Sequence, residues 1–173
     1  MNGAIFYSGQ YGSTAQYAAW IGEETGLPVF DIIADSADPA DFDFVVLGSS
    51  VIIYKLTIRE WVKTHLPSLE NRPVIVFSVS GAGAGPKLDK WVANSLPKPL
   101  LRRVEHVALK GRQRRGDLRW WTRAILWVGA QFNDDPKAAR GELKGFDYVD
   151  KASIEPIVNM IKILQSQPAT GRA

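Results

Sequence analysis

The chain has 173 residues and no cysteine, which suits one domain with its own core and excludes disulfides and thiolate chemistry. No apolar run approaches the roughly 20 residues needed to span a bilayer, and no basic leader precedes the first apolar run, so we expect a cytoplasmic protein without a signal peptide. The net charge of +3 is unevenly distributed: residues 1–54 carry seven acidic and no basic side chains, whereas residues 98–123 carry nine basic and two acidic ones, which predicts either an anionic partner or simply a solvated basic loop.

Short apolar runs alternate with helical patterns along the chain. Five runs predict strands, at residues 4–7, 29–32, 44–48, 74–78 and 104–109, and most of them are continuously apolar and rich in β-branched residues, as expected of strands covered on both faces. The fifth run is less apolar, because Glu105 and His106 lie within it. Helices are expected at 13–25, at 57–69, from Pro86 onward and at 153–165. This alternation predicts an α/β domain with a doubly wound, five-stranded parallel sheet in the flavodoxin-like order 2-1-3-4-5.

Several helix ends carry local signals in the sequence. Gly26 is placed to end the first helix. Thr57 and Glu60 have the spacing of a capping box at the start of the second. Pro156 fits the last helix only within its first turn, which favours Ser153 as the N-terminal cap.

Residues 110–149 do not fit the simple alternation, because they are too long for an ordinary connection. They open with a basic loop and continue with a pattern that predicts a helix at 118–131, in which Trp120, Trp121 and Trp127 lie beside arginines. We interpret the segment as a functional insertion before the last helix of a single domain, residues 1–173. Tryptophan and basic side chains together favour contact of residues 110–131 with an anionic membrane surface.

The stretch from Tyr7 to Thr14 joins the first predicted strand to the first predicted helix. Backbone N–H groups at a helix start, with nearby hydroxyl groups, form a phosphate-binding site. No Lys or Arg precedes Lys55, so neutral donors must hold the phosphate. This favours a flavin mononucleotide (FMN) site over a nucleoside triphosphatase, which uses a lysine in its phosphate loop.

Two further loops follow the third and fourth strands, and in a sheet of this order all three converge on one crevice. The second loop offers an apolar surface and a tyrosine to a flat ring, and the third offers glycines that let backbone amides approach closely. The candidate cofactor-binding residues are Ser8, Gln10, Tyr11, Gly12, Ser13 and Thr14 in the first loop, Ser49, Ser50, Val51, Ile52 and Tyr54 in the second, and Ser80, Gly81, Ala82, Gly83 and Gly85 in the third.

Simpler interpretations stay open for these residues. Ser13 and Thr14 can be helix caps, and the tyrosines can be packing residues. The glycines at 81–85 follow the fourth strand and lack the spacing of an NAD-binding fingerprint. His65 and His106 are far apart and there is no cysteine, so no metal site and no catalytic triad is indicated, and the catalytic residues stay unknown.

Most of the chain resembles the flavodoxin-domain proteins that include the flavodoxin-type, menaquinone-dependent protoporphyrinogen oxidases. The resemblance lies in Tyr7-Ser8 with 11–14, in 47–51, 59–65 and 72–73 with 77–79, and in the insertion at 108–109, 119–125 and 147–150. The sequence departs from the family at Gly9, where a hydroxyl residue is common, and in the short Gly/Ala run of the third loop.

The resemblance implies an FMN-dependent oxidoreductase that passes electrons from a reduced small molecule, such as a tetrapyrrole precursor, through the flavin to a quinone, peripheral to the inner face of the membrane. The alternative is a flavodoxin-type electron carrier without its own substrate, although such carriers tend to be acidic and this chain has a pI near 9.2. A flavodoxin-like binding protein that has lost its flavin is the third interpretation. A homo-oligomer stays open, and nucleic-acid binding has no motif behind it.

Overall fold

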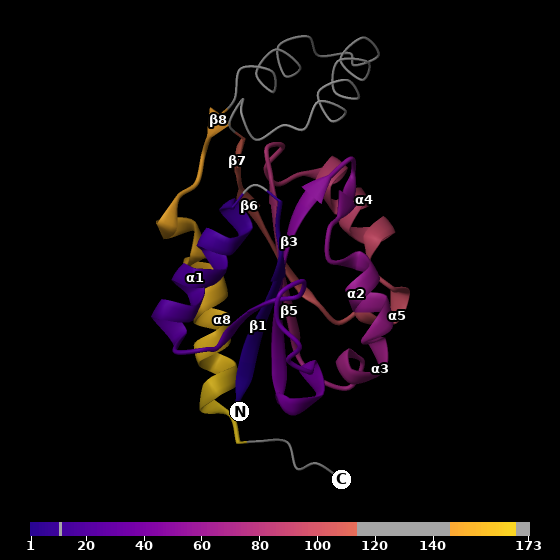
Figure 1. Ribbon diagram of the computed structural model, residues 1–173, viewed down its shortest axis with the longest axis vertical. Helices are drawn as coiled ribbons and strands as arrows, with labels where there is room; N and C mark the ends of the chain where they lie inside the picture. The colour runs from indigo at the N-terminus through magenta and orange to yellow at the C-terminus, as the bar shows by residue number, and fades with distance from the viewer. Residues whose placement is uncertain (11, 114–145, 169–173) are drawn as a thin grey trace.

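The computed structural model describes residues 1–10, 12–113 and 146–168, and a parallel sheet runs through its centre (Figure 1). The strands of this sheet are β1 (Gly3–Ser8), β2 (Val29–Asp31), β3 (Phe44–Ile52), β5 (Val74–Ser80) and β6 (Glu105–Lys110). They pair in the order β2-β1-β3-β5-β6, and every pair along this path is parallel. The five strands therefore have the order 2-1-3-4-5, and the predicted α/β flavodoxin-like fold is confirmed.

Helices cover both faces of the sheet (Figure 1). One face carries α1 (Ser13–Thr25) and α8 (Glu155–Ser166), and the other carries α2 (Arg59–Thr64), α3 (Leu66–Leu69), α4 (Pro86–Ser95) and α5 (Lys98–Leu101). A cluster of buried apolar side chains lies on each side of the strands. This explains why the strands are continuously apolar: every residue of β5 is buried, since both of its faces are covered.

Two helix boundaries agree closely with the sequence signals. The first helix spans Ser13–Thr25 as expected, and Gly26 follows it in the left-handed conformation, with φ of 72°. The N–H of Gly26 donates to the carbonyl of Gly22 at 2.8 Å, a bond typical of a glycine that ends a helix. Helix α4 begins at Pro86, a residue suited to the first turn because it has no N–H to leave unpaired.

The expected helix at 57–69 is divided in two, and its predicted capping box is wrong. Pro67 has no N–H with which to continue the hydrogen-bond ladder, and the chain breaks at His65 between α2 and α3. The residue that caps α2 is Ile58, and it makes no side-chain capping bond. The Thr57 hydroxyl instead donates to the carbonyl of Ser8 at 2.9 Å, because the neighbouring strand end offers it an acceptor.

The last helix begins two residues later than expected, and Ser153 does not cap it. A short 3₁₀ turn, η2 (Lys151–Ile154), comes first and is capped by Asp150, whose carboxylate accepts from the N–H of Ala152 at 3.0 Å. Helix α8 then starts at Glu155, with Pro156 in its first turn as predicted. A second 3₁₀ turn, η1 (Pro39–Asp41), precedes β3.

Two strand pairs lie beyond the five predicted strands. The two-residue strand β4 (Lys55–Leu56) folds back antiparallel on the end of β3. The second pair joins β7 (Arg112–Gln113) and β8 (Phe146–Asp147), which border the segment expected as an insertion. The helix expected at 118–131 lies outside the described residues, so the insertion at 110–149 and the single-domain assignment stay predictions.

Candidate functional site

The carboxyl ends of β1, β3 and β5 lie side by side at one edge of the sheet. Ser8 of β1 is opposite Ser49 of β3, and Ser49 is opposite Ser78 of β5. The three loops that leave these strand ends therefore begin next to one another. Their proximity follows from the parallel register, since neighbouring parallel strands end at the same edge and an open sheet binds ligands where its strand order reverses.

The first loop leads directly into the N-terminus of α1. Gly12 precedes this helix with a φ of 80°, a left-handed conformation that glycine adopts without strain, and its position is exposed. A side chain built at Gly12 would meet none of the other described residues within 4 Å, so as far as the described chain goes the space beside the helix start is open. The first N–H groups of a helix have no partner within it and attract an anion. Gln10 is exposed beside them, and Tyr11 lies outside the described residues.

The hydroxyl groups of this loop turn inward toward neighbouring strands. Thr14 is fully buried, and its Oγ1 lies 2.7 Å from the Oγ of Ser50 on β3. Ser13 is 4% exposed, and its Oγ accepts from the N–H of Arg112 at 3.2 Å. These two side chains fix the start of α1 to β3 and to Arg112 near the base of the β7–β8 pair, which leaves mainly the backbone N–H groups to face a phosphate.

Gly9 is packed too closely for a side chain in this conformation. A Cβ at Gly9 would lie 2.8 Å from the Cβ of Thr14 and 3.4 Å from the Oγ of Ser50. A side chain at Gly9 would therefore displace the Thr14 side chain.

The second loop is shorter than expected: β3 continues through residues 49–52, which the sequence predicts as loop residues, and a tight hairpin then joins β3 to β4. Ile53 and Tyr54 form its two-residue turn with φ angles of 47° and 62°, both left-handed. Such a turn ordinarily uses Asn-Gly, and a β-branched residue there is strained by about 1–3 kcal/mol. The sequence signal for a hairpin is therefore absent, which is why β4 was not predicted.

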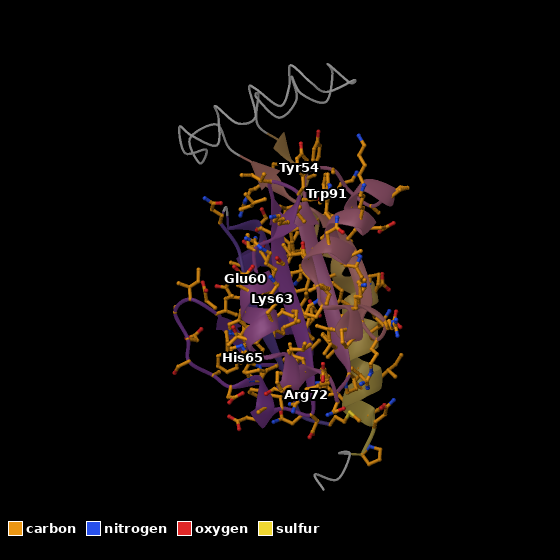
Figure 2. The ribbon with its side chains drawn as sticks, turned by 90° about the vertical axis from the view of Figure 1, so that its right-hand side faces the viewer. Tyr54, Glu60, Lys63, His65, Arg72 and Trp91 are labelled. Carbon is orange, nitrogen blue, oxygen red and sulfur yellow. The ribbon has the colours of Figure 1, made fainter. Side chains whose placement is uncertain are left out.

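Tyr54 projects from this turn beside Trp91 of α4 (Figure 2). Its side chain is 61% exposed, and the two ring centroids are 5.0 Å apart at an interplanar angle of 43°. The hairpin is held to the same helix by the N–H of Leu56, which donates to the buried Oγ of Ser95 at 3.0 Å. No sequence signal marks Trp91 as a neighbour of the site, because its contact with Tyr54 crosses two elements.

The third loop follows β5 and starts at a buried polar group without a partner. Ser80 is 7% exposed, and its Oγ has no hydrogen-bond partner among the described residues. Gly83 and Gly85 have φ angles of 69° and 152°, and Gly81 and Ala82 are exposed. A buried hydroxyl left unpaired costs about 1–3 kcal/mol, which is a reason to expect a ligand atom beside it.

Two titratable groups near the sheet have shifted pKa values. Burial, followed by the charge and hydrogen bond of Asp31, raises the pKa of the Tyr7 phenol, which keeps it protonated. Burial lowers the pKa of His106, although the charge of Asp89 opposes this. The His106 Nε2 lies 2.8 Å from the Oγ of Ser78. Because Ser78 is fully buried, this pair supports packing between strands and offers no accessible nucleophile.

The part of the chain that the structure describes contains neither a metal-binding cluster nor a membrane-spanning helix. Within residues 1–10, 12–113 and 146–168, no group of three His, Cys, Asp or Glu side chains is placed to hold a metal ion. His65 stacks on Trp61 with ring centroids 4.2 Å apart, and its Nδ1 lies 2.9 Å from the Trp61 carbonyl. Among the same described residues, no helix combines the length and apolar character needed to cross a membrane.

Several solved structures are similar to this chain. A protein from Bacteroides eggerthii named as a flavoprotein has 17% identity over 73% of this chain and 96% of its own, with a TM-score of 0.50. An archaeal flavodoxin matches at 15% identity over 94% and 99% of the two chains, with a TM-score of 0.44. An azoreductase from Bacillus anthracis matches at 12% identity over 83% and 99%, with a TM-score of 0.42. No curated protein sequence matches.

The sequence pattern of one family covers most of the chain. The Flavodoxin domain family matches residues 4–139, which include all three loops of the candidate site. The chain therefore belongs to the Flavodoxin domain family.

Proposed function

We propose that the protein is an FMN-dependent oxidoreductase whose flavin binds across the three loops at the carboxyl edge of the sheet. The single observation that carries this proposal lies at one edge of the sheet: among the described residues, the start of α1 at Gly12 is open and the buried hydroxyl of Ser80 has no hydrogen-bond partner. A flavin has a terminal phosphate for the first feature and polar ring atoms for the second. Membership of the Flavodoxin domain family supports the same cofactor.

Each loop supplies a different kind of contact in this proposal. The N–H groups at the start of α1, with Ser8 and Gly12 beside them, hold the phosphate. Tyr54 presents a flat, exposed ring to the apolar part of the flavin. The Ser80 hydroxyl and the glycine backbone of the third loop bind the polar edge of the ring.

Bound FMN supplies the chemistry of accepting and donating electrons, and the chain supplies position and environment. The buried Thr14–Ser50 pair, at 2.7 Å, holds the phosphate loop against β3. Residues 1–54 contain no Lys or Arg. The phosphate donors of this segment are therefore neutral hydroxyl and backbone N–H groups. The exposed turn at Tyr54 leaves that side of the crevice accessible to a reductant or an acceptor.

The finer proposal concerns the reaction. The resemblance to flavodoxin-type protoporphyrinogen oxidases supports a tetrapyrrole precursor or similar small reductant and a quinone acceptor. It also supports contact between residues 110–131 and an anionic membrane surface at its cytoplasmic side. Of this segment, Lys110 is exposed and Arg112 is half-buried.

An assay with purified protein tests the cofactor and the reaction separately. We expect a visible flavin absorbance spectrum after purification or after reconstitution with FMN. We then expect flavin-dependent oxidation of protoporphyrinogen with a soluble quinone analogue as acceptor. A flavin-loaded protein without this turnover, but with rapid electron exchange with other redox proteins, would support the electron carrier instead. A protein that takes up no FMN would refute both.

A further inference from the structure

We infer that Ser13 and Tyr17 couple the first loop of the site, which we call the phosphate loop, to the base of the ribbon formed by β7 and β8. This ribbon base consists of residues 110–113 and 146–150. A phosphate bound at the start of α1 then tightens this ribbon base. The inference rests on the proposed function only in taking the phosphate to be that of FMN. Ser13 and Tyr17 are positioning residues, because they act through the strands beside the site.

Ser13 belongs to the phosphate loop through its backbone and contacts the ribbon base through its side chain. It is the first residue of α1, so its backbone belongs to the turn whose N–H groups receive an anion. Its side chain points the other way: the Oγ accepts from the N–H of Arg112 at 3.2 Å and lies 3.5 Å from the Arg112 carbonyl oxygen. One residue therefore joins the phosphate loop to the first strand of the ribbon.

Tyr17 lies one helical turn after Ser13 and on the same face of α1. It is fully buried, and its hydroxyl donates to the carbonyl of Lys110 at 2.7 Å. The same oxygen accepts from the N–H of Asp150 at 3.1 Å. A single phenol thus joins the strand that enters the ribbon to the chain that leaves it.

Two side-chain contacts within the ribbon base are more exposed. Arg112 and Asp147 approach to 4.0 Å, and the Lys110 ammonium lies 5.8 Å from the centroid of the Tyr148 ring. Exposed ion pairs of this kind stabilise little. The buried hydroxyls of Ser13 and Tyr17 therefore make the stronger side-chain contacts of the ribbon base, and both contacts lead to α1.

The ribbon base also touches the third loop of the site. The N–H of Gly111 donates to the carbonyl of Ser80 at 2.9 Å, and the N–H of Tyr148 donates to the carbonyl of Gly111 at 3.2 Å. Ligand contacts at the start of α1 and at Ser80 therefore act on the same short stretch of backbone. Coupling between two such sites is reciprocal, so that a phosphate that orders α1 slows local opening of the ribbon base.

Amide hydrogen exchange of the full chain measures this coupling. The reporters are the N–H groups of Gly111 and Tyr148, whose acceptors are backbone carbonyls that no substitution removes. We expect saturating FMN to slow their exchange at least about fivefold, the lower end of ordinary coupling between sites. Saturating riboflavin, which lacks the phosphate, is expected to slow it less.

Conservative variants identify the coupling residues. Tyr17→Phe and Ser13→Ala are expected to bind FMN, followed by quenching of flavin fluorescence, yet to lose the added protection at Tyr148. Tyr7→Phe is the matched control, since Tyr7 makes no contact with the ribbon base in the hydrogen bonds that the structure describes, and it is expected to retain the protection.

The outcomes separate this inference from the proposed function. FMN binding without slower exchange at Gly111 and Tyr148, or equal slowing in Tyr17→Phe and Ser13→Ala, would overturn the inference and leave the flavin site intact. If FMN does not bind, the proposed function fails. The same exchange measurement with inorganic phosphate in place of FMN then tests the inference, because the inference requires only that a phosphate bind at the start of α1.

Discussion

Replacement of Thr14 by valine tests the buried hydrogen bond that fixes the phosphate loop to the sheet. Thr14 and Ser50 are 0% and 8% exposed, and their hydroxyl oxygens are 2.7 Å apart. Valine has nearly the same shape, so the packing is retained and only the hydrogen bond is lost. The change leaves the Ser50 hydroxyl buried without this partner, which costs about 1–3 kcal/mol.

The free energy of unfolding in urea measures this loss. For a small domain with a slope of about 2 kcal/mol per molar urea, a cost of about 2 kcal/mol lowers the unfolding midpoint by about 1 M. The double variant Thr14→Val/Ser50→Ala removes both partners and is expected to cost less than the sum of the single variants. Thr25→Val is the control on the same helix: its Oγ1 donates only to the Ile21 carbonyl at 2.6 Å, within the helix. A Thr14→Val midpoint equal to wild type, or strict additivity of the two changes, would refute the reasoning.

Three further predictions concern stability. Gly48→Ala is expected to destabilise by about 1–3 kcal/mol in the same urea assay, because its Cβ would lie 2.3 Å from the Phe77 ring; wild-type stability would contradict this. The lowered pKa of His106 means that the unfolded state binds a proton first, so this contribution to stability is complete above about pH 6.5 and declines as pH falls toward the lowered value. His106→Gln is expected to reduce that slope between pH 7 and 5, and an unchanged slope would count against it. Replacing Ile53-Tyr54 by Asn-Gly suits the left-handed turn and is expected to raise the melting temperature while weakening flavin binding, and a lower melting temperature would show that the turn is not strained.

The fold could be predicted from the sequence because the central strands β1, β3 and β5 are largely buried on both faces and are therefore apolar. The continuous apolar run at 74–78 and the helix signals at Gly26 and Pro86 are local, and the structure follows them. Local signals failed where a tertiary contact decided the outcome. Thr57 has the spacing of a capping residue, but the carbonyl of Ser8 lies close enough to take its hydroxyl.

In the candidate site too, the sequence predicts the general arrangement, and tertiary contacts decide the rest. The three loops follow from strand order alone, whereas the roles of individual side chains depend on contacts across the sheet. The sequence predicts Ser13 as a phosphate donor or a helix cap. Its hydroxyl instead accepts from the backbone N–H of Arg112, a residue distant in sequence. Tyr17 carried no functional signal, because a buried aromatic residue on a helix is ordinarily part of the core. The hairpin that carries Tyr54 uses residues that no turn rule predicts.

The central claim is that a phosphate-bearing flavin binds at the start of α1. Calorimetric titration of flavin-free protein with FMN and with riboflavin tests it most directly. One charge-assisted hydrogen bond contributes about 1.5–3 kcal/mol, and 1.4 kcal/mol is tenfold in affinity. We therefore expect FMN to bind at least about tenfold more tightly than riboflavin. Equal affinities, or no binding of either flavin, would contradict the account.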